Sequence, residues 1–256
     1  MTGIRDIFET AIGRSPAVGF TRRAREELVD LRLDFADYEY LEGRVAGFDA
    51  RGAALFEAPI RDFVAAIPCF TPDTLLATES GACRAGDLVP GARLLTRDNG
   101  VQVLRWIGER TFSARDLALN PLLRPVRVRA GALGPDQPLR DLIVSPSHHL
   151  LSVFHDGQGE AMVMARDLVG MDGIEEITPQ EGVRYLQLLF DRHELILGEG
   201  VWAESFRPTP ESIAALEQIA RADLLAKRAD LLESADYRPV RPSLSGLRRS
   251  LHDAHG

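Results

Sequence analysis

The chain has 256 residues, a formal net charge of −8 and two cysteines, with 45% hydrophobic and 27% charged residues. These values are ordinary for a globular protein, so one large domain, or a core domain with extensions, can bury a sizeable core. The acidic balance argues against a general nucleic-acid binder or a polybasic membrane anchor. Two cysteines cannot form a disulfide framework, and no run reaches the roughly 18 apolar residues of a membrane span.

The first 68 residues are predicted to form an extension of helices and a hairpin. Apolar residues at helical spacing and a candidate N-cap at Thr21 predict helical structure over residues 2–33. Residues 37–60 hold short apolar runs broken by glycines, which favours a small hairpin. The first residues lack the long apolar core of a secretory signal. A cytoplasmic location is therefore the default expectation, with export independent of a signal peptide as the alternative.

From Cys69 to Phe206 the sequence reads as short strands separated by turn residues. Regular short strands favour a compact all-β unit over an alternating βαβ sheet. The strand-sized segments are residues 74–78, 92–96, 102–107, 124–130, 141–145, 149–154, 161–165, 183–190 and 194–200.

After Phe206 the apolar period becomes helical again. Thr209 can cap a helix, and Pro210 suits its first position. An apolar stripe of Ile213, Leu216, Ala220, Leu224 and Leu231 follows, and then an extended proline-containing tail. The expected organisation is an N-terminal extension (1–68), a mainly β core (69–206) and a C-terminal helix with a tail (207–256).

A weak internal echo runs through the core. "FTPDTLLAT" is followed by "RAGDLVPG", and "VSPSHHLLS" is followed by "MARDLVGMDG". One interpretation is coincidence in a leucine-rich chain. The other is a duplicated β unit whose halves face each other across a pseudo-two-fold axis, with Cys69 and His148 at matching ends and close in space.

Cys69, Ser145 and His148 are the first candidates for chemistry. A lone cysteine is most often a buried small hydrophobe, but Cys69 lies in a polar, loop-like Pro-Cys-Phe-Thr-Pro setting, whereas Cys83 does not. Ser145 and His148 are spaced Ser-x-x-His at the end of an apolar strand, which lets a hydroxyl and an imidazole serve one site. His149 would point to the opposite face of an extended segment.

Asp191 and His193 form a further candidate pair. They are two residues apart, so on a strand they share a face. The structural alternative, a solvated turn with an ordinary ion pair, is slightly favoured for Asp191 and about equal for His193. A metal site built from His148, His149, His155 and His193 ranks last, because the spacing matches no standard ligand motif. No metal and no cofactor is expected.

Three blocks of the sequence resemble Hint domains, the self-processing modules of inteins and Hedgehog proteins. The blocks are "CFTPDTLLATESG…DLVPGARLLTRDNG", "LIVSPSHHLL" and "VRYLQLLFDRHELILGEGVWAESF", and they occur in the family's order over residues 68–206. The chain is most similar to the bacterial stand-alone Hint-2 type. The resemblance implies a horseshoe-like all-β core with a pseudo-two-fold repeat, flanked here by helical N- and C-terminal extensions.

The resemblance also implies a reaction. Cys69 would attack the Pro68 carbonyl in an N-to-S acyl shift, His148 would protonate the departing amide nitrogen, and Ser145 would hold the scissile amide. Water or another nucleophile would resolve the thioester, so the partners are the chain's own N-terminal segment and an unknown acceptor. Glu204 and Ser205 stand where inteins end in His-Asn, and because asparagine cyclisation needs a side-chain amide, cleavage or transfer is expected rather than full splicing.

Two other functions remain open. Cys69 and His148 could form a cysteine hydrolase that acts on a separate substrate. Alternatively, the core could be a catalytically silent binding or secretion-associated module, an alternative that the crowded proline carbonyl at Pro68 keeps open. The oligomeric state is left undetermined.

Overall fold

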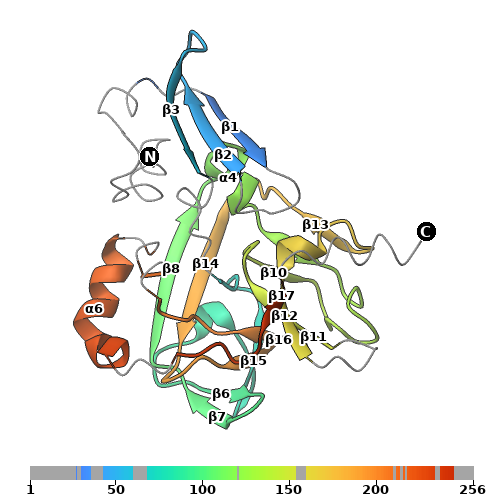
Figure 1. Ribbon diagram of the computed structural model, residues 1–256. Helices are drawn as coiled ribbons and strands as arrows, with labels where there is room; N and C mark the ends of the chain where they lie inside the picture. Colours follow the sequence, from blue (N-terminus) through green and yellow to red (C-terminus); the bar gives the residue numbers. More distant parts are fainter. Residues whose placement is uncertain are drawn as a thin grey trace.

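The computed structural model describes most of the chain and confirms a mainly β protein (Figure 1). The described residues are 27, 30–35, 43–59, 68–119, 121–153, 160–209, 212, 213, 216, 218–233 and 237–244.

The N-terminal part contains a three-stranded antiparallel sheet, formed by β1 (Asp30–Phe35), β2 (Gly43–Phe48) and β3 (Ala54–Pro59). The hairpin predicted over residues 37–60 is thus confirmed as β2 and β3. Residues 30–33, predicted as helix, lie in β1 instead, because the alternating stretch "DLRLDF" suits a strand paired with β2. The rest of the predicted helix 2–33 lies outside the described residues, except Glu27, which is helical.

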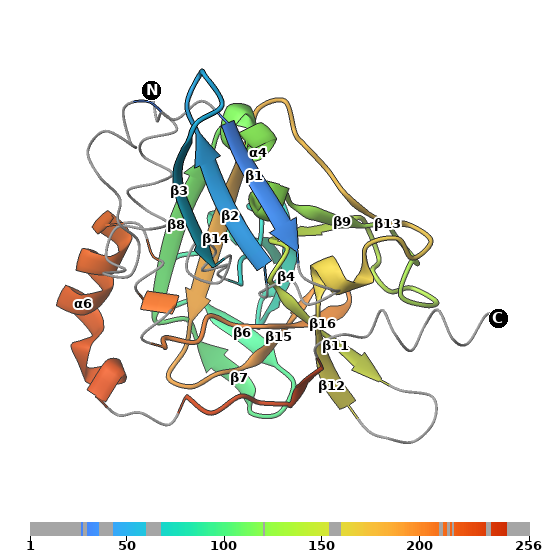
Figure 2. The same ribbon diagram turned by 45° about the horizontal axis from the view of Figure 1, so that its top comes forward.

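The largest sheet contains nine strands in the order β17-β12-β11-β16-β15-β4-β6-β7, with β5 paired to β4 (Figure 2). These strands are β4 (Leu75–Thr78), β5 (Gly81–Arg84), β6 (Arg93–Thr96), β7 (Gly100–Val103), β11 (His149–Val153), β12 (Glu160–Met164), β15 (Leu195–Gly198), β16 (Val201–Glu204) and β17 (Ser243–Leu244). A smaller sheet has the order β10 (Leu142–Val144), β9 (Val126–Val128) and β13 (Ile174–Glu176). Most predicted strands coincide with these elements.

A long two-stranded ribbon joins β8 (Trp106–Phe112) to β14 (Val183–Leu189). The strand predicted over residues 102–107 is divided between β7 and β8. Leu104 N–H still bonds Ala92 O at 2.8 Å, whereas Arg105 N–H bonds Leu189 O at 2.8 Å. The chain therefore leaves one sheet and enters the next between these two residues.

The β8–β14 ribbon separates two hydrophobic clusters, which explains why β14 is almost continuously apolar. Leu186 and Leu188 point into the main core, between the large sheet and the β9–β10–β13 sheet. Tyr185 and Leu189, on the alternate face, join Trp106 in a second cluster. That second cluster is closed by Leu216 and Leu224, the latter on α6 (Gln218–Glu233), which lies beside β8 in Figure 1.

The predicted cap at Thr209 is confirmed. Ser212 N–H bonds Thr209 Oγ1 at 3.1 Å, and Ile213 N–H bonds Thr209 O at 2.9 Å. This is the hydrogen-bond pattern of a helix N-terminus, in which the cap side chain satisfies an otherwise unpaired amide. The apolar stripe that follows includes the fully buried Leu224, so helical spacing correctly identified the face that covers the ribbon.

The internal echo corresponds to a structural repeat. Thr74 N–H bonds Thr71 O, and His148 N–H bonds Ser145 O, so the same turn occurs twice. Each turn then receives two amides from a 3₁₀ helix, either η1 (Ala85–Asp87) or η3 (Ala165–Leu168). Ala85 and Gly86 donate to Thr74 O and Pro72 O, and Ala165 and Arg166 donate to His148 O and Pro146 O. The residue equivalent to His148 is therefore Thr74, so the prediction that Cys69 and His148 occupy matching ends of the two halves was wrong.

A hydroxyl of each repeat also contacts the backbone of the other repeat. Ser145 Oγ accepts the Cys69 amide N–H at 3.0 Å, and Thr71 Oγ1 donates to Ile143 O at 2.8 Å. Thr71 corresponds to Ser145, and Ile143 corresponds to Cys69 in the same register. The repeat thus brings Cys69 and Ser145 together, although 76 residues separate them in the chain.

Candidate functional site

Cys69 lies between β10 and β14, immediately before an isolated bridge residue. Phe70 pairs with both Val144 and Leu186, and its two backbone bonds to Leu186 measure 2.8 and 3.0 Å. This double pairing fixes the chain at the start of the core, so Cys69 is buried, with 3% of its surface exposed, while Pro68 is half-buried.

Ser145 makes two hydrogen bonds to the backbone of Cys69, one to its N–H and one to its carbonyl oxygen. Its hydroxyl accepts the Cys69 N–H at 3.0 Å, and its own N–H donates to Cys69 O at 3.0 Å. Because both bonds are buried, leaving either group unpaired would be costly. The nitrogen of the Pro68–Cys69 bond therefore has a fixed direction relative to Ser145.

His148 is buried beside this peptide, with 1% of its surface exposed. Its ring packs edge-on against Phe70, with 4.4 Å between ring centroids. Neither ring nitrogen has a hydrogen-bond partner among the described residues. Burial lowers the pKa of His148 to about 4, although the charge of Glu204 and the nearby Cys69 backbone oppose this shift. The ring is therefore neutral at pH 7, and burial disfavours its protonated form.

The Cys69 thiol faces Gln187, whose Nε2 donates to Sγ at 2.9 Å. Burial raises the pKa of the Cys69 thiol to about 12, while Gln187, the charge of Arg110 and Ser145 pull it down. The resting group is thus a thiol, which must lose its proton before it can act as a nucleophile.

Gln187 and Arg110 were missed by the sequence reasoning. Gln187 is a buried amide in the otherwise apolar stretch "RYLQLLF", and that contrast is the one signal that could have found it. Its position depends on the residue opposite it, Gly108, where a Cβ would lie 2.5 Å from Gln187 Oε1 and 2.2 Å from the Trp106 ring. A glycine is therefore needed there for the amide to reach the thiol.

A small pocket opens beside the thiol, with an empty volume of about 330 Å³ including its mouth. Cys69, Ser145 and Gln187 line one side. The other residues of the wall are Arg110, Phe112, Leu122, Leu123, Pro146, Ser147 and Tyr185. The pocket therefore adjoins the buried thiol.

His149 and His193 meet at Glu204 rather than at Cys69. Glu204 Oε1 accepts from His149 N–H at 3.0 Å and also bonds His149 Nδ1, while His193 Nε2 lies 3.3 Å from Oε2. Burial raises the pKa of Glu204, but the contacts with both histidines outweigh it and lower the pKa to about 2. His148 packs against Phe70, whereas His149 bonds Glu204.

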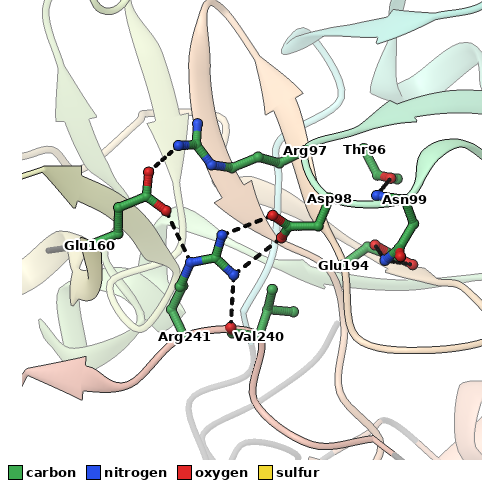
Figure 3. A network of polar contacts seen from close by, with 8 residues as sticks. All are labelled: Thr96, Arg97, Asp98, Asn99, Glu160, Glu194, Val240 and Arg241. Atoms are coloured by element: carbon green, nitrogen blue, oxygen red, sulfur yellow. Dashed lines mark hydrogen bonds and ion pairs between the residues drawn. The ribbon is translucent and has the colours of Figure 1, made fainter.

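A C-terminal segment, residues 237–244, is bound to this part of the core (Figure 3). Val240 N–H donates to His193 Nδ1 at 3.3 Å, so the ring proton is on Nε2, facing Glu204. Arg241 bridges Asp98, at 2.8 Å, and Glu160, at 3.0 Å. The segment ends in β17, which pairs with β12.

Asp191 lies apart from the other candidates. Its carboxylate is 44% exposed and pairs with Arg105 at 2.7 Å and Arg228 at 3.6 Å. The structure therefore brings Cys69, Ser145 and His148 together, whereas His193 contacts Glu204 and Asp191 forms a surface ion pair. Of the four histidines considered as a metal site and ranked last, His155 lies outside the described residues.

The described residues contain no helix that is both long and apolar enough to span a membrane. Within the same residues, no three His, Cys, Asp or Glu side chains converge as a metal-binding group.

A mainly β core that begins at a buried cysteine, with the serine and histidine of a second repeat beside it, has the architecture of an autoprocessing-type domain. A sequence model of the Hint domain matches residues 68–210, more than half of the chain, and the protein belongs to the Hint-domain family. No curated protein matches the sequence.

Several solved structures are similar to this chain. The gp41-1 intein is 10% identical, covering 53% of this chain and 97% of its own, with a TM-score of 0.34. A DnaB intein from Synechocystis sp. PCC 6803 is 11% identical, covering 54% and 98%, with a TM-score of 0.35. A bacterial intein-like domain from Clostridium thermocellum is 11% identical, covering 54% and 97%, with a TM-score of 0.38.

Proposed function

We propose that the protein cleaves its own chain between Pro68 and Cys69 through a thioester, without full splicing. The observation that carries the proposal is the arrangement at Cys69. The amide nitrogen is held by Ser145, the thiol is contacted by Gln187, and a neutral buried imidazole lies beside the same peptide.

The first step moves the acyl group from nitrogen to sulfur. The thiol proton passes to neutral His148, and Sγ attacks the Pro68 carbonyl carbon. His148 then returns that proton to the Cys69 nitrogen, because an unprotonated amide anion is a very poor leaving group. The C–N bond breaks, and a thioester joins the Pro68 carbonyl to Cys69 Sγ.

The second step resolves the thioester. Attack by water breaks the C–S bond and gives a carboxylate at Pro68 and a free thiol at Cys69. Another nucleophile in place of water would instead receive the N-terminal segment. The products are residues 1–68, carrying the acceptor, and residues 69–256.

Two features support a slow reaction. The pKa of about 12 at Cys69 leaves almost no thiolate at neutral pH, and attack on a proline carbonyl is sterically crowded. The same two features are what favour the second candidate, a catalytically silent Hint-fold module.

The end of the core supports cleavage over splicing. Ser205, at the place of the intein asparagine, is buried, and its hydroxyl accepts the Glu194 N–H at 2.9 Å. Phe206 follows and is packed in the second hydrophobic cluster. Ser205 lacks the side-chain amide, and Phe206 lacks the nucleophile, that the later splicing steps need at these places.

Mass spectrometry of the purified chain, with and without hydroxylamine, tests the proposal. Cleavage between Pro68 and Cys69 is expected, accelerated by hydroxylamine and abolished in Cys69→Ala. The matched control is Cys83→Ala, which removes the other cysteine and should cleave like the parent. A chain that stays intact under every condition through long incubation would leave the silent module as the function.

A further inference from the structure

Glu204 is a buried carboxylate that the proposed reaction has not yet used. It lies on β16 and is 6% exposed. Although burial raises the pKa of Glu204, its contacts with His149 and His193 lower the value to about 2, so the carboxylate is ionised at neutral pH. Keeping a charge in the interior costs free energy even when it is paired, and such groups are frequent at reactive sites.

The carboxylate lies next to His148 in the structure. The N–H that Glu204 Oε1 accepts, at 3.0 Å, belongs to the peptide that joins His148 to His149. This contact depends on the pairing of β11 with β16, in which Leu150 lies opposite Ala203. A fixed negative charge is therefore present one peptide group away from the histidine that is proposed to carry the proton.

The charge of Glu204 acts mainly on His148 rather than on the thiol. Burial lowers the pKa of His148, and the charge of Glu204 is the largest influence in the opposite direction. Burial is also the main cause of the raised pKa of Cys69, to which Glu204 contributes least. The carboxylate therefore favours a proton on the imidazole more than it disfavours loss of the proton from sulfur.

Two further histidines face this region, and positive charge on either would oppose Glu204. Val240 N–H donates to His193 Nδ1 at 3.3 Å, so that nitrogen carries no proton and His193 is neutral. His149 Nδ1 bonds the carboxylate itself. The C-terminal segment thus helps to keep the surroundings of Glu204 free of an additional positive charge.

The acyl shift places a positive charge on His148, where burial disfavours it. A carboxylate already fixed beside a histidine can stabilise the imidazolium that forms during a reaction without taking its proton. Because the carboxylate is in place before the reaction, no reorganisation is needed when the charge develops.

We propose that Glu204 is a positioning residue of the cleavage reaction, whose fixed negative charge stabilises the imidazolium of His148 while it carries the thiol proton. This inference rests on the proposed thioester. The proton leaves Cys69 Sγ, resides on His148 and passes to the Cys69 nitrogen as the C–N bond breaks. Glu204 neither gains nor loses a proton.

Glu204→Gln tests the role of the charge, because it keeps the size of the side chain and an oxygen for the His149 N–H. Cleavage is measured at saturating hydroxylamine and at pH 8, where an ordinary histidine is neutral. The variant should cleave at least about tenfold more slowly, since one pKa unit in the imidazolium is a factor of ten. Glu204→Asp keeps the charge and should retain most of the rate.

Glu199→Gln is the matched control, since it neutralises another buried carboxylate of the same hairpin. The Glu199 carboxylate is 3% exposed, accepts the Leu75 N–H at 2.7 Å and pairs with Arg140 at 2.7 Å. This variant should lower the free energy of unfolding and still cleave like the parent. If Glu204→Gln does not fold, Glu204→His, which inserts the residue that inteins carry at this place, should give the same slow cleavage.

A second measurement does not depend on cleavage. In Cys69→Ala, which cannot cleave, nuclear magnetic resonance should show the His148 ring titrating with a midpoint of about 4. Adding Glu204→Gln should lower the midpoint by at least about one pH unit, corresponding to the expected tenfold loss of rate. Adding Glu199→Gln should leave the midpoint unchanged, which a purely structural role of Glu204 does not predict.

The outcomes separate the two proposals. Parent-like cleavage in a folded Glu204→Gln chain would overturn the role of Glu204 and leave self-cleavage standing. Equal slowing by Glu199→Gln, or an unchanged His148 midpoint in Glu204→Gln, would do the same. A parent chain that hydroxylamine does not cleave would overturn both.

Discussion

The Ser145 hydroxyl accepts the Cys69 amide N–H at 3.0 Å, and the equivalent hydroxyl in the other repeat, that of Thr71, bonds Ile143 O at 2.8 Å. Both contacts join one half of the core to the other. Only the first contact lies at the peptide that is proposed to break. Removing each hydroxyl in turn therefore distinguishes a structural role of the contact from a role in cleavage.

Ser145→Ala should slow cleavage about fivefold, because it removes one hydrogen bond worth about 1 kcal/mol from the scissile amide. Ser145→Thr keeps the hydroxyl and should retain most of the rate. Thr71→Ala is the matched control: it should lower the free energy of unfolding by a similar amount and leave cleavage unchanged. Equal losses of rate in Ser145→Ala and Thr71→Ala would show that the contact is structural alone. The measurements are cleavage time courses and denaturant unfolding.

His148 makes stability depend on pH. Burial lowers its folded-state pKa to about 4, against 6.5 in the unfolded chain, so the unfolded state binds the proton more readily. Its contribution is fully present above pH 6.5 and is lost as the pH falls toward 4, by about 3 kcal/mol in total. His148→Phe should flatten this part of the curve of unfolding free energy against pH. An unchanged slope in the variant would rule out His148 as its source.

The two cysteines should differ in reactivity. Burial raises the pKa of Cys69 to about 12, so at pH 8 roughly one molecule in 10⁴ carries the thiolate. Iodoacetamide at pH 8 should therefore label Cys83, which is partly exposed, well before Cys69. Peptide mapping gives the order of labelling, and the reverse order would contradict the buried thiol. Gln187→Leu should slow Cys69 labelling further, since Gln187 lowers the thiol pKa.

Gly108→Ala should displace the Gln187 amide from the thiol. The new Cβ would lie 2.2 Å from Trp106 and 2.5 Å from Gln187 Oε1, and such overpacking costs about 1–3 kcal/mol of stability. Slower cleavage is expected as well, because the thiol loses its donor. Thr111→Ala, at an exposed position of the same strand, is the control and should change neither quantity. Thermal unfolding and cleavage rates measure both effects.

Arg241→Gln should loosen residues 237–244. Arg241 bridges Asp98 and Glu160 with 24% of its side chain exposed, and we expect a loss of about 1 kcal/mol after allowance for solvent screening. Hydrogen exchange at the Val240 amide should become faster. Arg84→Gln removes an ion pair to Asp73 in which both side chains are mostly exposed, and it should have almost no effect. Equal protection of Val240 in both variants would mean that Arg241 does not hold the segment.

The sequence was sufficient for the parts of the site that lie within local motifs. The Ser-Pro-x-His turn and the cysteine before a strand were visible in single short stretches. The echo correctly indicated two related halves, but it matched Cys69 with His148, whereas the structure matches Cys69 with Ile143 and His148 with Thr74. Gln187 and Arg110 were missed because their roles depend on the register between β8 and β14, which are about 70 residues apart in the chain and are aligned only by tertiary packing.

Glu204 was identified from the sequence only as the residue that stands where inteins have the histidine of their terminal His-Asn pair. Its contacts with His149 and His193 were not predicted. A buried carboxylate between two imidazoles follows from strand pairing, since Leu150 lies opposite Ala203 where β11 meets β16. No pattern in "WAESF" alone gives that pairing. The predicted helix over residues 2–33 was wrong at its end, where alternation over residues 30–33 forms β1.

The two hydroxyl contacts between the repeats also bear on whether the product of cleavage, residues 69–256, stays folded. When the bond to Pro68 breaks, the nitrogen stays with Cys69, and the resulting amine can still donate a hydrogen bond to Ser145 Oγ. Phe70 remains paired with Val144 and Leu186. The product 69–256 would therefore begin at an anchored residue and keep its two halves joined, so that release of the N-terminal segment does not unravel the domain that released it.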